Sequence, residues 1–111
     1  MAISAEYRDY LEDLFAPVGG VTQRRMFGGL GIFRDGVMIA LVDDEILYFK
    51  ADETTVPRFE AEGSEPFVYQ SKGKQVALSY WRAPAFLFED AGAFRGWARA
   101  AHDAALRAKR E

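Results

Sequence analysis

The single histidine of the chain, His102, stands next to Asp103 in a segment rich in alanine. Histidine and aspartate together form the base and its orienting acid in many hydrolases. Adjacent residues of a helix point about 100° apart, however, so this pair is not a preformed dyad. No serine or second histidine lies at a motif spacing. We therefore expect His102 to be an exposed helical histidine without a catalytic role.

Carboxylates are numerous, but their spacing matches neither a metal loop nor an acid–base pair. Asp43, Asp44 and Glu45 share one expected turn, and further acidic pairs flank a short helix at 52–53 and 60–62. The D-x-D-x-D-G pattern of a calcium loop does not occur. We interpret these residues as solvated surface.

The segment Gly28-Gly29-Leu30-Gly31 invites comparison with phosphate-binding loops. A dinucleotide site needs G-x-G-x-x-G at the start of a helix, and a Walker loop ends in G-K-[ST]. Neither pattern is complete here, and a strand follows. A structural role is favoured, in which the glycines permit a bulge or the close approach of another element.

Two arginines precede these glycines. On a strand, Arg24 and Met26 share one face, while Arg25 and Phe27 share the other. One arginine then points toward the less polar side, where it needs a hydrogen-bonding partner. The segment is either an edge that binds a partner or a phosphate, or a charged strand with a buried ion pair.

Other basic residues offer weaker signals. Lys72 and Lys74 stand at an expected hairpin tip, where they are placed to contact phosphates or simply to aid solubility. Arg82 follows Tyr80 and Trp81, a mixture typical of stacking surfaces, although strand alternation favours burial of at least one ring. The last helix carries five further cations: Arg95, Arg99, Arg107, Lys109 and Arg110. The last three complement the dipole at a helix C-terminus.

Composition narrows the class of protein. A chain of 111 residues, half of them apolar and 14% aromatic, forms one domain with a real core. The absence of cysteine excludes a disulfide scaffold, a thiolate metal site and a cysteine nucleophile. Fourteen basic and seventeen acidic residues give a net charge of −3, so any DNA contact needs a local basic patch.

The start of the chain lacks the features of a signal peptide, and the longest apolar run, residues 37–42, is too short for a membrane span. We expect a cytoplasmic protein.

Apolar spacing predicts a helix at each end of the chain. In the first helix Ser4 is the expected N-cap and Pro17 ends it, with one buried face: Tyr7, Leu11, Leu14, Phe15 and Val18. In the last helix Asp90 is the N-cap and Arg107 lies near the end, with Phe94, Trp97, Ala98, Ala101 and Ala105 on one face. The apolar segment at 85–88 matches neither a helix nor a strand pattern clearly.

Between these helices the apolar period changes to two, which predicts strand-like runs at 24–29, 30–34, 37–42, 46–50, 67–70 and 76–81. Asp35-Gly36 is the strongest hairpin signal, because a type I′ turn needs positive φ at both central residues. A helix of two turns, with Thr55 as N-cap and Gly63 at its end, lies within 52–63. The elements predict an α+β class in two layers. The chain is expected to form an N-terminal helix, an antiparallel β-meander of about five strands with a short inserted helix, and a C-terminal helix. The helices pack on one face of the sheet.

Several segments follow one another in a specific order and spacing. They are Arg25-Met-Phe-Gly-Gly29 after a first helix, Leu47-Tyr-Phe-Lys50 with Ala51-Asp52, Pro57-Arg-Phe-Glu60, Pro66-Phe67, and Val76-Ala-Leu-Ser-Tyr80 ending in Arg82-Ala-Pro84. This series resembles the N-terminal domain of the TfoX/Sxy family over about residues 4–105. The resemblance implies an α-β-α fold like that of secretion-chaperone domains and a role linked to bacterial DNA transformation. The better-known members regulate natural competence as coactivators with the cAMP receptor protein at particular promoters, and those proteins carry a second, C-terminal helical domain.

Because the chain ends at Glu111, we expect residues 1–111 to be a stand-alone N-terminal domain of this kind. The resemblance offers no catalytic, metal or cofactor residues, and we expect none. The leading hypothesis is a non-enzymatic regulatory module whose partner is a transcription factor of the cAMP receptor protein type or RNA polymerase. Its contact surface is expected at residues 24–29 and Arg82.

Two alternatives stay open. One is direct nucleic-acid binding through Lys72, Lys74 and the terminal helix, and the other is binding of a small ligand in a pocket between sheet and helices. The oligomeric state also stays open. An exposed edge strand is able to pair two copies into a homodimer, but the sequence does not say which strand is the edge.

Overall fold

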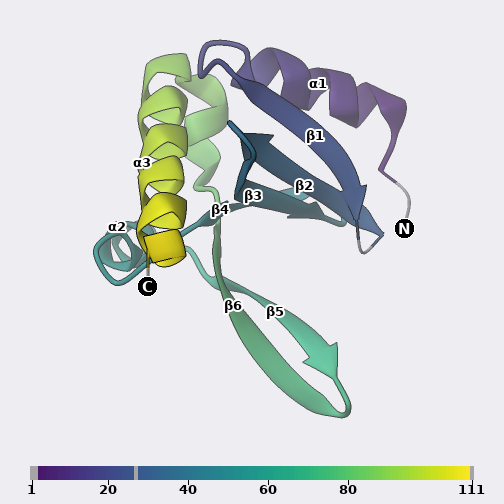
Figure 1. Ribbon diagram of the computed structural model, residues 1–111, viewed down its shortest axis with the longest axis vertical. Helices are drawn as coiled ribbons and strands as arrows, with labels where there is room; N and C mark the ends of the chain where they lie inside the picture. Colours follow the sequence, from purple (N-terminus) through teal and green to yellow (C-terminus); the bar gives the residue numbers. More distant parts are fainter. Residues whose placement is uncertain (1–2, 27, 111) are drawn as a thin grey trace.

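The computed structural model describes residues 3–26 and 28–110, with the backbone alone for Ser71, Val76 and Ala77. A six-stranded antiparallel sheet carries helices on one of its faces (Figure 1). The α+β class predicted from the sequence is confirmed, with six strands in place of about five.

Helix α1 (Ala5–Phe15) begins where its cap predicts. The Ser4 Oγ accepts a hydrogen bond from the Tyr7 N–H at 3.1 Å, which satisfies one of the free donors of the first turn. The expected inner face of this segment is buried or half-buried in the core: Tyr7, Leu11, Leu14, Phe15 and Val18.

Helix α3 (Ala91–Arg110) follows a short 3₁₀ turn, η1 (Ala85–Glu89), and runs slightly beyond its predicted end. The Asp90 Oδ1 accepts the Ala93 N–H at 3.0 Å and so provides the predicted cap. The helix buries four alanines together with Phe94 and His102. The alanines are Ala98, Ala101, Ala104 and Ala105.

The prediction that His102 is exposed is wrong, because only 8% of this residue is accessible. It lies one helical turn after Ala98, at the margin of the buried alanine face. This position turns its ring toward the sheet, where Arg34 Nη1 lies 2.7 Å from His102 Nδ1.

The strands are β1 (Val21–Met26), β2 (Gly29–Arg34), β3 (Val37–Asp43), β4 (Ile46–Lys50), β5 (Pro66–Ser71) and β6 (Lys74–Arg82). Their order in the sheet is β1-β2-β3-β4-β6-β5. After β4 the chain passes through helix α2 (Val56–Ala61), and the second strand of the next hairpin, not the first, pairs with β4. The sheet therefore departs from a simple meander, and its edges are β1 and β5.

Three hairpins have two-residue turns in which both residues have positive φ. The pairs are Asp35 and Gly36 at 53° and 79°, Asp44 and Glu45 at 52° and 59°, and Lys72 and Gly73 at 52° and 78°. These are the values of type I′ turns, whose twist matches that of the flanking strands. All three turns predicted from the sequence are confirmed.

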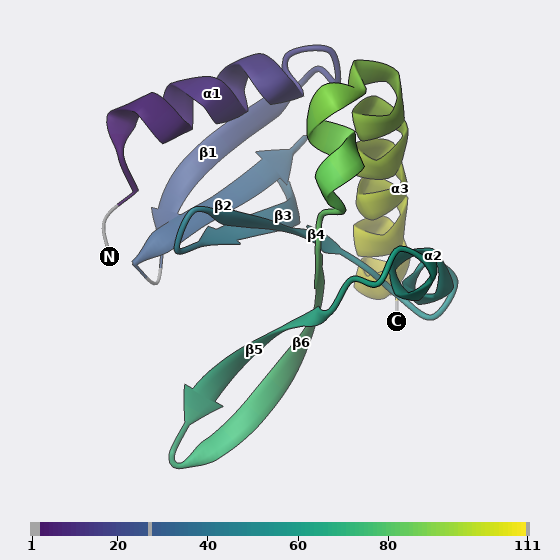
Figure 2. The same ribbon diagram turned by 180° about the vertical axis from the view of Figure 1, so that it is seen from behind.

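The core lies between the helices and one face of the sheet. Three phenylalanine rings from α1, β4 and α3 meet there, with the Phe15 and Phe94 centroids 4.9 Å apart and those of Phe49 and Phe94 5.5 Å apart. In the described ranges 3–26 and 28–110 no helix covers the opposite face (Figures 1 and 2), and the β5–β6 hairpin projects from the body as an arm. No helix among residues 3–26 and 28–110 is both long and apolar enough to cross a membrane.

Candidate protein-contact site

A groove of about 600 Å³ lies on the helix-free side of the sheet, and we call it the outer groove. Strands β1 to β3 line one side of it, and the arm lines the other. The lining residues are Met26, Gly29, Leu30, Met38, Leu41, Val42, Asp43, Phe67, Val68, Tyr69, Leu78 and Tyr80. Since β4 separates β3 from β6 in the sheet, the sheet must curl for these strands to face a common space.

The curl begins where the arm leaves the body. Strand β6 pairs with β4 through its last residues alone, Tyr80 to Arg82, so the rest of β6 is free to bend away with β5. Aromatic contacts hold the corner: the Tyr48 and Phe67 ring centroids are 4.9 Å apart, and Phe67 stacks with Tyr69 at 6.4 Å. Lys50 Nζ lies 5.2 Å from the centre of the Tyr80 ring, close enough for a cation–π contact.

The lining of the outer groove is mainly aliphatic, aromatic and thioether. Met26 and Met38 contribute flexible, polarisable side chains that adapt to irregular apolar surfaces. Among the described residues, Asp43 supplies the one carboxylate of the lining. The Tyr80 phenol is neutral and able to donate a hydrogen bond at physiological pH, and burial raises its pKa further. The groove is thus suited to apolar side chains or to an apolar small molecule.

The predicted contact segment borders this groove in part. Met26 and Gly29 line it, and Arg24 is exposed on the same side of the sheet, with its guanidinium carbon 4.8 Å from the centre of the Phe33 ring. Gly28 lies in the turn between the first two strands with φ of +76°. Phe27, which belongs to the predicted segment, lies outside the described residues.

Arg25 is exposed on the helix side of β1, as the alternation of the strand requires. The alternative of a buried ion pair is wrong, because both arginines of this strand are exposed. Across the described part of the chain the one salt bridge joins Arg107 and Asp52, with Nε and Oδ2 2.6 Å apart.

The glycines act structurally, as predicted. A Cβ atom on Gly29 would overlap the carbonyl oxygen of Val42, and one on Gly31 would overlap the sulfur of Met26. Strand β3 therefore approaches Gly29 closely, and Met26 packs directly over Gly31. The segment is built for tight strand packing beside the outer groove.

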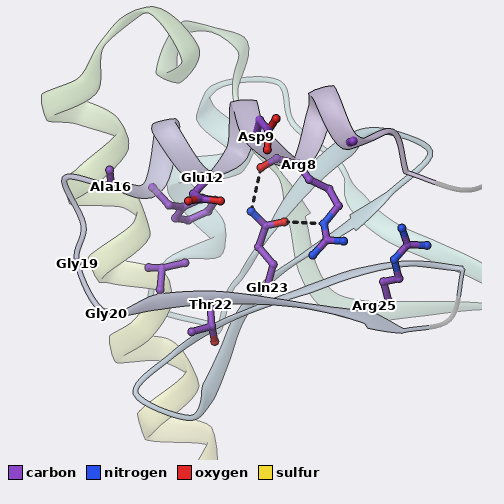
Figure 3. Close-up of a pocket in the computed structure, with 12 residues that line it drawn as sticks. Arg8, Asp9, Glu12, Ala16, Gly19, Gly20, Thr22, Gln23 and Arg25 are labelled. Carbon is purple, nitrogen blue, oxygen red and sulfur yellow. Dashed lines mark hydrogen bonds between the residues drawn. The ribbon is translucent and has the colours of Figure 1, made fainter.

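A second cavity, of about 540 Å³, separates α1 from β1 (Figure 3). Arg8 Nε donates to Gln23 Oε1 at 3.4 Å, and Gln23 Nε2 donates back to the Arg8 carbonyl at 3.0 Å. Arginines and carboxylates share its rim: Arg8, Arg25, Asp9 and Glu12. The charges balance, so this cavity favours neither an anion nor a cation.

Arg82 does not join the predicted segment. Three strands stand between β1 and β6 in the sheet, so Arg24 and Arg82 lie on strands that are not neighbours. Arg82 lines a small cavity of about 140 Å³ with Tyr7 and Glu45. Burial, with smaller contributions from Tyr10 and Glu45, raises the pKa of Tyr7 to about 12.

The basic residues proposed for nucleic-acid contact also lie apart. Lys72 and Lys74 are exposed at the tip of the arm, whereas the C-terminal end of α3 lies at the other side of the molecule in both views (Figures 1 and 2). At that end Arg107 is bound to Asp52. The two sets of cations do not form one patch.

Ten of the twelve lining residues were not proposed as contact residues from the sequence: Leu30, Met38, Leu41, Val42, Asp43, Phe67, Val68, Tyr69, Leu78 and Tyr80. A signal for part of this set is the unbroken apolar run at 37–42. Such a run is typical of a strand with both faces buried, whereas helices cover only one face of this sheet. An apolar face without a helix is the expected lining of a binding groove.

The TfoX N-terminal domain family matches residues 13–105 of this chain, from within α1 to near the end of α3. The chain belongs to this family. The match to the TfoX N-terminal domain includes every strand and the whole outer groove, and it confirms the resemblance seen in the sequence. This TfoX domain is also similar to the DNA transformation protein TfoX1 of Aliivibrio fischeri (strain ATCC 700601 / ES114), with 34% identity over 64 residues. That alignment covers 58% of this chain and 31% of the relative, so it spans less than a third of the relative's length.

Proposed function

We propose that this TfoX N-terminal domain is a non-enzymatic cytoplasmic module that regulates DNA transformation through protein contacts. Family membership and the name of the Aliivibrio fischeri relative support the pathway. The observation that carries the mode of action is the apolar outer groove, which Met26 and Gly29 of the predicted contact segment line. Its partner is a transcription factor of the cAMP receptor protein type or RNA polymerase.

The groove has the features of a protein-recognition surface. Its apolar floor accepts side chains from a helix or a strand, and its two methionines adapt to their shape. Arg24 stands nearby, with its guanidinium over the Phe33 ring and exposed. Arginine, tyrosine and tryptophan are the residue types most enriched among those that carry the binding energy of protein interfaces.

Charge supports protein contacts over binding to DNA. The chain carries a net charge of −3, and the lysines of the arm tip lie apart from the cations of α3. Binding to the DNA backbone needs a concentrated cationic surface that displaces counterions from several phosphates. An apolar groove needs no such surface.

The decisive experiment measures binding of the domain to the purified regulator of the cAMP receptor protein type and to RNA polymerase from the same cell. Moderate salt and nuclease treatment remove contacts that run through DNA. Met38→Glu and Leu41→Glu place a carboxylate in the groove and should each weaken binding by at least about tenfold. Tyr10→Glu is the matched control, because it places the same carboxylate at a large side chain of α1 that is 43% exposed and lies outside the groove.

Unchanged binding by both groove variants, with thermal unfolding showing that they are folded, would contradict the proposed surface. Binding to both purified partners that disappears on nuclease treatment would contradict protein contact and favour nucleic-acid binding. The double variant Arg24→Ala/Arg25→Ala tests the adjoining strand. It should weaken capture of the partner while unfolding stays cooperative, because both side chains are exposed.

A second function is favoured by the size of the same groove. Its volume of about 600 Å³ exceeds the roughly 300 Å³ that a small-molecule site needs. An apolar fluorescent probe such as anilinonaphthalene sulfonate should then bind the folded domain and be released by Met38→Glu. Absence of probe binding would remove this alternative without affecting the protein-contact proposal.

A further inference from the structure

The two edges of the sheet differ in how they are protected. Helix α1 lies beside β1, which also carries Arg24 and Arg25 (Figure 2). Strand β5 (Pro66–Ser71) contains no charged residue, and in the part of the chain that the structure describes it pairs with β6 alone. Val68 is 44% exposed and Tyr69 41% exposed on this strand. Long uncharged edges with exposed apolar residues are the edges that pair with another strand.

The register of the arm shows which backbone groups are free. Ser71 and Lys74 flank the two-residue turn, so their backbone groups bond to each other. In an antiparallel ladder the direction of the backbone groups alternates from residue to residue. The N–H and C=O groups of Val68 and Gln70 therefore point away from β6, along the outer edge of the arm. They form a row of donors and acceptors ready for a further strand.

We propose that the occupant of this edge is β5 of a second copy of the chain, aligned antiparallel about a two-fold axis. Charge argues for this partner and this direction. Glu65 precedes the strand and Lys72 follows it, and both are exposed. Antiparallel pairing brings the acidic end of each copy beside the basic end of the other, whereas parallel pairing would bring like charges together.

The pairing makes one continuous sheet through both arms. Val68 and Tyr69 line the outer groove as well as the edge, so the second copy lies against one wall of each groove. Two six-residue strands offer a contact smaller than the roughly 1,200 Å² of a stable interface. The dimer is therefore weak, and it forms as the protein concentration rises.

Sedimentation equilibrium over micromolar to millimolar concentrations tests the dimer, and proline variants test the edge. Gln70 faces Gln75 in a pair without mutual hydrogen bonds, so the N–H groups of the two residues point to opposite edges of the arm. Gln70→Pro removes a donor from the outer edge of β5, and Gln75→Pro removes one from the other edge. Neither removes a hydrogen bond of the hairpin.

We expect the wild-type chain to dimerise, Gln70→Pro to weaken the dimer by at least about tenfold, and Gln75→Pro to leave it unchanged. A monomer at every concentration, or equal dimerisation of wild type and Gln70→Pro, would overturn the proposal. So would a loss confined to Gln75→Pro. Charge-reversal variants test the antiparallel direction independently of the proline variants. Glu65→Lys should weaken the dimer, and Glu65→Lys combined with Lys72→Glu should restore it. Failure of that rescue would overturn the antiparallel arrangement.

Discussion

Arg34 at the end of β2 donates from Nη1 to His102 Nδ1 of α3 at 2.7 Å, across 68 positions of the sequence. A guanidinium has only donors, so the histidine nitrogen must accept, and the proton of the neutral ring resides on Nε2. That Nε2 is buried without a hydrogen-bond partner among the described residues. Arg34 Nε also donates to the Gly19 carbonyl at 2.9 Å. One arginine thus links the sheet to the last helix and to the loop before β1.

A double-mutant cycle on this pair should show coupling of about 1–3 kcal/mol in the free energy of unfolding. Arg34→Met loses both hydrogen bonds, whereas His102→Leu loses one and also removes the unpaired Nε2–H. We therefore expect Arg34→Met to cost more than His102→Leu in urea unfolding. Additive effects of the two substitutions would show that the contact contributes nothing to stability.

The close approach of β3 to Gly29 makes any side chain at this position destabilising. Gly29→Ala should lower the free energy of unfolding by about 1–3 kcal/mol, because the new methyl group overlaps the carbonyl of Val42. Gly96→Ala is the control: a Cβ atom there meets nothing within 4 Å, and the residue lies inside a helix. That variant should gain up to about 1 kcal/mol. Urea unfolding of both variants checks the prediction, and equal effects would contradict it.

The salt bridge of Asp52 predicts a loss of stability in acid. A hydrogen bond from Arg107 holds the pKa of this carboxyl well below its usual range, and bonds from the hydroxyl and N–H of Thr54 add to the effect. Because the folded pKa is the lower one, the contribution is complete above about pH 4 and is lost as the pH falls below it. The side chains of Arg107 and Asp52 are 40% and 22% exposed, so solvent screening keeps the effect modest.

The free energy of unfolding of the wild-type chain should accordingly fall more steeply below about pH 4 than that of Asp52→Asn. Glu53→Gln, a substitution at the exposed neighbouring carboxylate, should follow the wild-type curve. Chemical unfolding at a series of pH values gives the comparison. Parallel curves for Asp52→Asn and wild type would show that the salt bridge does not stabilise the fold.

The turn between β3 and β4 stores strain that a substitution can relieve. Asp44 and Glu45 both adopt positive φ without a glycine, unlike the turn at Asp35 and Gly36. Replacing the pair with Asn-Gly should stabilise the domain by about 1 kcal/mol, read as a rise in Tm. Gly36→Ala, which introduces the same kind of strain at φ of +79°, should lower Tm. A fall in Tm for the Asn-Gly variant would contradict this account.

Local features of the chain were predictable. The caps at Ser4 and Asp90 and the turn at Asp35-Gly36 depend on hydrogen bonds and dihedral angles within a few neighbouring residues. Apolar periodicity likewise predicted both long helices and the α+β class. The order of several short motifs was enough to indicate the TfoX N-terminal domain.

The outer groove, the free edge at β5 and the burial of His102 were decided by the tertiary structure alone. Each depends on which distant segments meet: β6 rather than β5 pairs with β4, and α3 brings His102 against Arg34. The interactions behind these choices join residues tens of positions apart. The free energy of these interactions comes from side-chain packing and strand pairing across the whole domain, so it cannot be predicted from a local pattern of residues.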